Sequence, residues 1–528
     1  MGSDSNGKSD STSFEGHRDA KAIVADEAYQ HDKANITSDE VMLKEQLGYE
    51  PEKNLSRNRG LFTLLFQSLA IAAIPYGEGA PLLSAIYGGG QLSIFLGWIV
   101  VCILDECVAL SLAELASRWP TSAGPAYWSF QLAKTNKTLA AYATGWIWLI
   151  GNITITLSVN FGFASLIGAC ITLFHPDFAL TAWQMLLIFY AVCLMTLIIC
   201  IFMNRILPYV DTLCAGFTAV TILIVLIALS VKAEAGRHSA ADALGAYDKS
   251  FAGYGGFTFF IGLLPAAYTF SAIGMITSMA EECNEAARQL PKALALAVPT
   301  GCIAGLFFII PICATLPPLA DIIENSGGQA LPYIFARVMG TPGGGVGLTA
   351  LVLIITLFCS ISITVAASRC TWAFARDDAI PGARWWAKVH PKLGVPVESL
   401  ILVTIVQMLL GIINIGSTSA FTAFISVGVV ALALSYGIPI AISMFDGRKE
   451  VSKAVFRLPS TIGWAVNGIS IIWIAFELVL FCMPGALPTT KTSMNYASVV
   501  LVGLSSIALA WYFIHSRKNY KGPPEENL

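Results

Sequence analysis

The chain has 528 residues, of which 55% are hydrophobic and only 12% are charged. Soluble domains carry about a quarter charged residues, so this composition excludes an ordinary soluble globular protein. The mean hydropathy of +0.68 indicates a chain that lies in a lipid bilayer, whereas the formal net charge of −3 says little about the class of protein. There the distribution of charge is more informative than its sum.

Each crossing of a bilayer needs roughly 20 mainly apolar residues. Windows of this kind predict an all-α integral membrane protein with about twelve transmembrane helices. We expect these helices near 61–87, 92–117, 139–172, 182–203, 211–232, 255–281, 294–317, 345–374, 397–415, 421–445, 463–484 and 495–514.

Residues 1–59 are rich in Asp, Glu, Ser and Lys without apolar periodicity, which predicts a disordered cytosolic tail. This tail is either a solvated appendage or a regulatory segment whose lysines are modified to control turnover. The candidate lysines are Lys8, Lys21, Lys33 and Lys44. We expect residues 516–528 to form a second, short cytosolic tail.

Basic residues are concentrated in alternate loops. The richer set comprises Arg118, Lys134, Lys137, Arg205, Arg288, Lys292, Arg376, Arg384, Lys388, Lys392, Arg448, Lys449, Lys453, Arg457, Arg517, Lys518 and Lys521. The poorer set comprises Lys232, Arg237, Lys249, Arg337 and Lys491. By the positive-inside rule the richer loops and both termini face the cytosol, so the number of spans is even. The sequons at Asn35, Asn54 and Asn136 then lie on the cytosolic side and should not be glycosylated.

The first apolar run is interrupted by residues 75–81 (PYGEGAP). Unpaired backbone groups and a carboxylate cannot face lipid, so this interruption predicts a cavity at membrane depth. Weak helix formers at 269–276 (TFSAIGMI) predict a second interruption in span 6. Two broken helices five spans apart predict an inverted repeat with the substrate site between the breaks. The repeats would cover about 60–232 and 253–445, with peripheral helices in 463–514.

Other segments give structural predictions. Residues 118–128 predict a re-entrant or interfacial helix, and 322–339 predict an outer loop with a helical stretch. The cysteines lie mostly within spans, without metal-ligand spacing, and are interpreted as small core residues. No metal and no cofactor are expected. Because no nucleophile–base pair is visible, we do not expect an enzyme, and we expect no nucleic-acid partner.

Four segments carry a family resemblance: 77–79 (GEG), 114–127 from ELA to Tyr127, 280–293 from AEE to PKA, and 368–396 with SRCTWAFARDDAIP and VHPKLGVP. In this order they resemble the amino acid–polyamine–organocation superfamily, and within it the fungal amino acid/choline transporters that include choline and γ-aminobutyrate permeases. The resemblance implies a leucine-transporter-like fold of five plus five spans with broken helices 1 and 6. It also implies alternating access, protons as the coupling ion, and a plasma membrane location, with the vacuolar membrane as the alternative.

Members of that family often carry an Asp where this chain has Gly274 and a His where it has Ser278. The substrate-binding candidates on span 6 are Phe270, Ser271, Ile273 and Gly274. On span 1 they are Tyr76, Gly77, Glu78, Gly79 and Ala80, whose backbone N–H groups would suit a carboxylate. Glu78 would meet a substrate ammonium, with an aromatic face from Tyr76 or Phe270, or carry a proton. The alternative for the span 1 break is a packing kink without ligand contact, and the alternative for Glu78 is a structural hydrogen bond to the interrupted helix.

Other polar residues have a functional and a structural interpretation. Asp105 and Glu106 point about 100° apart on a helix, so one of them should face the bundle interior as a proton-coupling candidate. Glu477 is interpreted as structural, because span 11 lies outside the repeats. Asn152 and Asn160 lie on roughly one face of span 3, as cavity lining or as helix–helix contacts. The candidates for an inner gate of ion pairs are Glu281, Glu282, Arg369 and Arg376. The alternative is that these four residues are solvated surface charges.

These expectations describe a proton-coupled carrier of a small amine, amino acid or choline-like solute. A second hypothesis is a carrier of a fungal secondary metabolite, such as a small alkaloid, or of its amine precursor. A third is a nutrient sensor that does not transport, which the short C-terminal tail disfavours. The basic loop 376–392 is also expected to contact anionic membrane lipid.

Overall fold

The computed structural model describes residues 39–52, 55, 57–176, 178, 180–416, 419–490 and 494–526. The chain divides into two compact units, Met1–Pro51 with Glu526–Leu528, and Glu52–Glu525. The predictions on Lys8, Lys21, Lys33, Asn35 and Asn54 lie outside the described residues. In the first unit a π-helical turn, η1 (Met42–Gln46), differs from the expected disordered tail. It carries Lys44, whose ammonium pairs with Glu50 at 3.1 Å.

The unit Glu52–Glu525 is a bundle of helices. Among the described residues, twelve helical segments are long and apolar enough to cross a membrane, which confirms the predicted number. The membrane helices are α2 (Leu61–Ala72) with α3 (Ile74–Gly79), α5 (Gln91–Arg118), α7 (Lys137–Phe174), α8 (Ala182–Phe202), α9 (Leu207–Lys232), α12 (Leu264–Ser271) with η4 (Ile273–Glu282), α13 (Ala286–Ala314), α16 (Pro342–Arg376), α18 (Val397–Gly411), α20 (Ala420–Phe445), α21 (Ser460–Leu480) and α22 (Ala497–Trp511).

Several helices extend beyond their apolar windows. Helix α13 begins at Ala286 rather than near 294, and it contains three prolines. The last span continues through η6 (Tyr512–Ser516) and α23 (Arg517–Asn519), so the expected C-terminal tail is helical up to Asn519. Hydropathy finds only the part of a helix that meets hydrocarbon, whereas polar and basic ends extend toward the headgroups.

Short helices connect the spans. The two predicted helical connections are present as α6 (Gly124–Leu132) and α15 (Ala330–Met339). The other connections contain α4 (Leu82–Tyr87), η2 (Asn204–Ile206), α10 (Ala240–Gly245), η3 (Gly255–Phe257), α11 (Thr258–Ile261), α14 (Leu319–Asn325), α17 (Ala383–Trp386), α19 (Ile413–Gly416) and η5 (Val451–Lys453).

The pattern of helix contacts repeats when the spans are shifted by five. Spans 3 and 4 pack as α7 on α8, and spans 8 and 9 as α16 on α18. Span 3 meets span 10 as α7 on α20, and span 8 meets span 5 as α16 on α9. Even the short connections correspond, since α6 packs on α7 and α15 on α16. Because each repeat has an odd number of spans, the two repeats cross the membrane in opposite directions.

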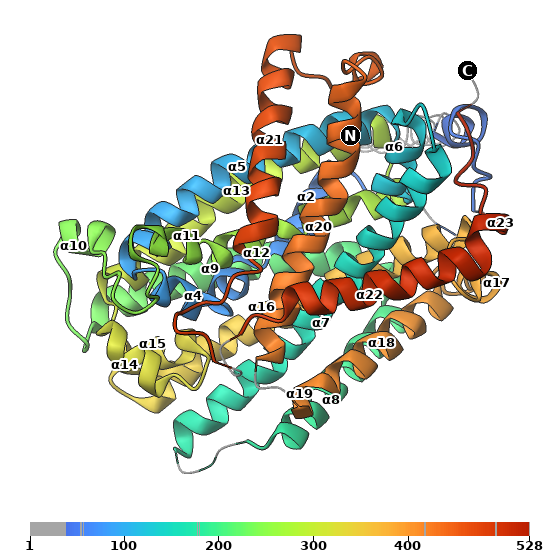
Figure 1. Cartoon of the computed structure of the whole chain (residues 1–528). Helices are drawn as coiled ribbons and strands as arrows, with labels where there is room; N and C mark the ends of the chain where they lie inside the picture. Colours follow the sequence, from blue (N-terminus) through green and yellow to red (C-terminus); the bar gives the residue numbers. More distant parts are fainter. Residues whose placement is uncertain are drawn as a thin grey trace, which may run out of the picture. The chain divides into compact units, whose positions relative to one another are not determined.

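Spans 2 and 7 occupy equivalent positions and lie side by side as α5 and α13 (Figure 1). The indole of Trp98 on α5 packs against Gly305 on α13, where an added Cβ would collide with the ring. Its Nε1 donates to the Cys302 carbonyl at 3.1 Å. A large ring against a glycine lets the two helices approach closely, which is how membrane helices gain van der Waals contact.

Candidate substrate site

Span 1 is interrupted on both sides of α3. Helix α2 ends at Ala73, which has left-handed backbone angles of φ 43 and ψ 53, and a second interruption at Ala80 and Pro81 separates α3 from α4. Residues Ile74–Gly79 are themselves helical, because Pro75 stands at the start of α3, where its missing N–H costs nothing. The expected single break at 75–81 is therefore two breaks that flank most of this motif.

The backbone of α3 is less available than predicted. The Gly77 N–H donates to the Ala73 carbonyl at 2.9 Å, and the Ala80 N–H donates to the Tyr76 carbonyl at 2.8 Å. The prediction that these two N–H groups are free for a carboxylate is wrong in this conformation. A Cβ on Gly77 would lie 2.6 Å from the Thr269 Oγ1, and one on Gly79 would collide with Leu331. Both glycines let α3 approach other helices closely, as in the packing-kink alternative.

Span 6 is broken where the sequence predicts. Helix α12 ends at Ser271, and after Ala272 the chain continues as the 3-10 helix η4. Gly274 leaves room for a ring, since a Cβ there would lie 2.5 Å from the Tyr436 Cε1. The Tyr436 hydroxyl donates to the Ser271 carbonyl at 3.1 Å. Tyr436 of span 10 thus fills the space that an Asp at position 274 would need.

A small cavity of about 10 Å³ lies between the two breaks, and we call it the break cavity. Its lining comprises Ser68, Ile71, Ala72, Thr269, Phe270, Ile273 and Ala297. The predicted Phe270 and Ile273 are among these residues, whereas Tyr76, Gly77, Glu78 and Gly79 are not. The sequence analysis did not name the α2 residues Ser68, Ile71 and Ala72. It concentrated on residues 75–81, which follow the break at Ala73, whereas these three residues precede it.

The break cavity suits a positive charge. It is lined by the last turns of α2 and α12, where the helix dipoles place partial negative charge. The Ile71 carbonyl accepts only a weak bond, from the Cys359 thiol at 3.1 Å. In this conformation the break cavity is large enough for a water molecule but not for a whole solute.

Glu78 is buried at 2% exposure, and its Oε2 has no hydrogen-bond partner among the described residues. Within the described part of the chain no basic side chain forms an ion pair with it. The Tyr76 hydroxyl lies 3.3 Å from the Ser158 and Val159 carbonyls, and Tyr76 packs edge-on against Tyr268. The predicted amine site of Glu78 with Tyr76 or Phe270 is therefore not assembled in one cavity here.

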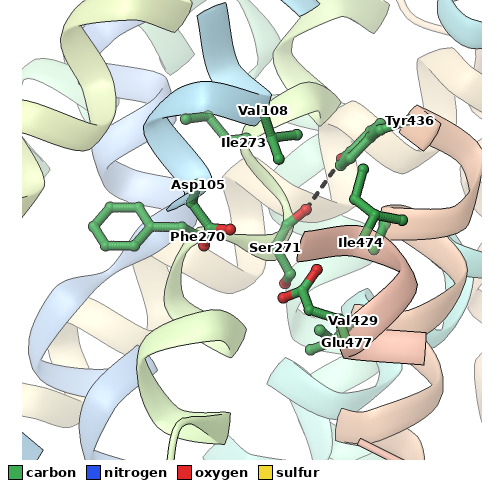
Figure 2. A pocket seen from close by; sticks show the side chains of 10 residues that line it. Asp105, Val108, Phe270, Ser271, Ile273, Val429, Tyr436, Ile474 and Glu477 are labelled. Carbon is green, nitrogen blue, oxygen red and sulfur yellow. Dashed lines mark hydrogen bonds between the residues drawn. The ribbon is translucent and has the colours of Figure 1, made fainter. Parts of the chain in front are cut away.

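A second small cavity, of about 20 Å³, lies between α5, α12, α20 and α21, and we call it the acidic cavity (Figure 2). It is lined by Asp105, Val108, Phe270, Ser271, Ile273, Val429, Ala433, Tyr436, Ile474 and Glu477. As predicted, one acid of the pair at 105 and 106 faces inward. It is Asp105, whereas Glu106 does not line this cavity, and the buried Oε2 of Glu106 has no partner in the part of the chain that the structure describes.

Glu477 is placed differently from the prediction. Helix α21 packs on α5 and α20, so it brings Glu477 into the acidic cavity beside the repeats. The sequence showed an isolated acid in an apolar span, which is itself a signal of function. The polar pair in span 3 has separate partners, since Asn160 donates to Gln407 at 2.7 Å and Asn152 donates to the Trp148 carbonyl at 2.8 Å.

One end of the bundle is closed by buried ion pairs, which we call the gate cluster. Glu282 accepts from Arg369 at 2.8 Å and from Arg59 at 3.1 Å, and Arg59 also pairs with Asp211 at 3.4 Å. Arg376 binds Glu281 through two bonds of 2.8 and 2.9 Å. The four predicted gate residues are thus paired and largely buried rather than solvated surface charges.

The sequence analysis missed Arg59 and Asp211. Arg59 fell within the expected tail, but its N–H donates to the Glu282 carbonyl at 3.1 Å and the residue is 1% exposed. Asp211 stood at the predicted edge of span 5 and accepts from the Ser362 hydroxyl at 2.6 Å. Asp211 and Glu281 each have a basic and a neutral donor, and Glu282 has two arginines, so every acid of the cluster is paired, which a buried ion pair requires in order to persist.

The other end of the same spans is hollowed. A cavity of about 300 Å³ is lined by Ala80, Pro81 and Ser84 at and after the second interruption of span 1, by Leu264 at the start of α12 and by Thr422 near the start of α20. The predicted site residue Ala80 therefore faces this cavity, which we call the outer cavity. The bundle is closed at the Arg59 end and indented at the opposite end.

Twelve apolar helices with two interrupted spans around buried cavities define a multi-pass membrane transport protein. Residues 60–505 match the amino acid permease family, and the chain belongs to that family. This confirms the resemblance read from the motifs, and the chain is a permease rather than an enzyme.

Three relatives cover most of the chain. It is 26% identical to the choline transporter of Saccharomyces cerevisiae, over 91% of this chain and 85% of that protein. It is 29% identical to the amino-acid permease BAT1 of Arabidopsis thaliana, over 92% and 96%. It is 27% identical to the polyamine transporter TPO5 of Saccharomyces cerevisiae, over 88% and 78%.

Proposed function

We propose that this chain is a secondary active carrier that moves a small amine, amino acid or choline-like solute across a membrane by alternating access. The cargoes in the names of the three relatives share a positively charged nitrogen. In the break cavity such a group would meet the negatively polarised C-terminal ends of α2 and α12, beside the side chains of Phe270 and Ile273. Affinity for a cation would then come from backbone carbonyls, while side chains would select its shape.

The gate cluster is the observation that carries the proposal. Arg59 stands just before span 1, Glu282 ends span 6 and Arg369 lies in span 8, so their pairing ties both broken spans to the surrounding helices. A site that opens alternately to the two sides of the membrane needs a closure that can form and break. The ion pairs of the gate cluster would hold one side closed, and they would break together when that side opens. The outer cavity marks the path on the other side.

We propose that the Arg59 end faces the cytosol, because the basic loops lie at that end of the spans. Both termini are then cytosolic. The plasma membrane is the proposed location, with the vacuolar membrane as the second candidate. The basic loop 376–392 would contact anionic lipid headgroups.

Protons are the proposed coupling ion. The candidates are the three carboxylic acids Glu78, Asp105 and Glu106, which lie in spans 1 and 2 without an ion pair among the described residues. An unpaired carboxylate in a membrane is costly, so each of these groups favours binding a proton or another cation. A group that takes up a proton on one side and releases it on the other would couple transport to the proton gradient.

The test is uptake by yeast that lacks its own permeases, with labelled choline, γ-aminobutyrate, amino acids and polyamines, with and without a protonophore. Saturable uptake that the protonophore abolishes is the expected result. No uptake of any solute, with the protein confirmed at the cell surface, would contradict the importer proposal. Export assays with amine metabolites would then examine the second hypothesis.

A further inference from the structure

We propose that residues 520–525, which we call the strap, regulate the gate cluster by holding α6 in place and so keeping the Arg59 end of the bundle closed. The strap follows the last span, which ends at Asn519. This inference rests on the proposed role of the gate cluster and names a regulation of that site. Opening of the Arg59 end would then depend on a segment that lies outside all twelve spans.

The first half of the strap is packed on aromatic side chains of α6 and α7. The Tyr520 ring meets Tyr142 of α7 edge-on, with the centroids 5.5 Å apart, and only 5% of Tyr520 is exposed. Gly522 lies flat on the Phe130 ring of α6, where an added Cβ would be 2.4 Å from the ring. Its φ of 85° is a conformation that glycine adopts at little cost. The strap thus covers Phe130, which is buried.

The second half is held by polar contacts. The Gln131 Nε2 of α6 donates to the Pro524 carbonyl at 2.9 Å, and Lys137 at the start of α7 pairs with Glu525 at 3.2 Å. The two side chains of that ion pair are 39% and 72% exposed, so it contributes little. Pro523 and Pro524 fix φ, so the free strap has few conformations to lose on docking. The strap is therefore ordered at low cost and can detach without unfolding a span.

The other end of α6 lies against the gate cluster. The Ser122 N–H, two residues before α6, donates to the Glu281 Oε1 at 3.1 Å, and the same carboxylate binds Arg376. Gly124 begins α6, and a Cβ there would lie 3.0 Å from the Thr277 Oγ1 of η4. Helix α6 is thus in close contact with the second half of span 6 at its first residue and with the strap near its last.

These contacts make α6 the wall against which η4 closes. Because η4 ends in Glu281 and Glu282, opening of the gate cluster requires η4 and α6 to separate. A helix is a rigid element, so fixing α6 at one end restricts its movement at the other. Contacts that are made in the closed form and lost on opening shift the equilibrium toward the closed form. The strap would therefore oppose opening, and its release would favour it.

The test is the rate at which N-ethylmaleimide labels Cys283 in the purified full chain. Cys283 directly follows Glu282 and is 0% exposed, so its thiol should react only when the gate cluster opens. Mass spectrometry of the peptide that contains Cys283 separates this reaction from that of the other cysteines. The internal reference is Cys170, which lies near the far end of α7.

Two variants weaken the strap. Gly522→Leu should expel it, because the added side chain collides with Phe130 and the φ of 85° is strained for leucine. We expect the labelling rate of Cys283 to rise about fivefold or more, with Cys170 unchanged. Gln131→Met removes one N–H donor and should raise the rate about twofold to tenfold. The matched control is Lys521→Leu, which places leucine at an exposed neighbouring position and should keep the wild-type rate.

A wild-type labelling rate of Cys283 in Gly522→Leu would overturn the proposal. An equal rise at Cys170, or a rise in Lys521→Leu, would also overturn it, since either reports a general loosening of the bundle. If the melting temperature shows that Gly522→Leu is not folded, Gln131→Met decides alone. The labelling needs no solute, so a chain that takes up nothing in the uptake assay contradicts the importer proposal without deciding the role of the strap.

Discussion

Arg59 and Glu282 lie 223 positions apart in the chain, yet their side chains form a buried ion pair of 3.1 Å. One residue precedes the first broken span and the other ends the second. The ion pair therefore joins the two elements whose relative movement alternating access requires. Glu282 also binds Arg369, so its loss would leave two arginines without their main partner.

We predict that Glu282→Gln lowers stability and uptake together. Removing one partner of a buried ion pair costs about 3–5 kcal/mol, because the remaining charges stay buried. The expected result is a clear fall in the melting temperature of the purified protein and a loss of uptake. The control is Glu285→Gln, whose carboxylate is partly exposed and 4.0 Å from Arg288, and which should cost less than about 1 kcal/mol. Equal melting temperatures for both variants would contradict a closing role for Glu282.

We predict that Glu78→Gln keeps the protein folded but removes its response to the proton gradient. Glu78 has no ion pair among the described residues and one unpartnered oxygen, so a neutral side chain of the same shape breaks no charged contact. Uptake should become insensitive to the protonophore. The measurement is initial uptake rate against external pH. A rate that keeps the wild-type pH dependence would remove Glu78 from the coupling mechanism.

We predict that Gly79→Ala impairs the carrier through packing rather than through substrate contact. The added methyl group would collide with Leu331 of α15, and overpacking of this kind costs about 1–3 kcal/mol. Adding Leu331→Ala should restore the melting temperature and uptake. If the second substitution restores stability but not substrate affinity, the glycine contacts the ligand after all.

We predict that the chain is glycosylated only where a sequon is placed at the end opposite Arg59. The native Asn136 sequon, at the start of α7, should stay unmodified. Gly327→Ser completes a sequon at Asn325, the exposed last residue of α14; nothing lies within 4 Å of an added Cβ, although the left-handed φ of 58° at position 327 adds some strain for a serine. A glycosidase-sensitive shift in gel mobility should appear for that variant alone. A shift in the wild type would reverse the proposed orientation.

Much of the fold was accessible from the sequence, because a bilayer restricts the solutions so strongly. Twelve windows of about 20 apolar residues are enough to give twelve spans, since every backbone polar group must be bonded within its own helix. The break in span 6 followed from small, weak helix formers around Gly274. The break in span 1 was misplaced by several residues, because Pro75 looked like an interruption and instead begins a helix.

The site was less accessible. Phe270 and Ile273 were named because they adjoin the span 6 break, and Asp105 because an acid in a span must face a cavity or a partner. Arg59 was misplaced in a disordered tail, and the position of Glu477 in a cavity wall was not foreseen, because each lies outside the segments that the repeat made prominent. Their positions depend on how α21 packs against α5 and how the residue before α2 meets the end of η4.

The sequence by itself determined that the chain is a twelve-span permease with two interrupted helices, because apolar length and helix-breaking residues act locally. Only the tertiary structure decided which acids meet a partner. Glu282 is paired by Arg59 and Arg369, whereas Asp105 and Glu477 face one cavity without a basic residue. Whether a buried charge is neutralised depends on side chains brought together from hundreds of residues away, and electrostatic energies change steeply over a few ångströms.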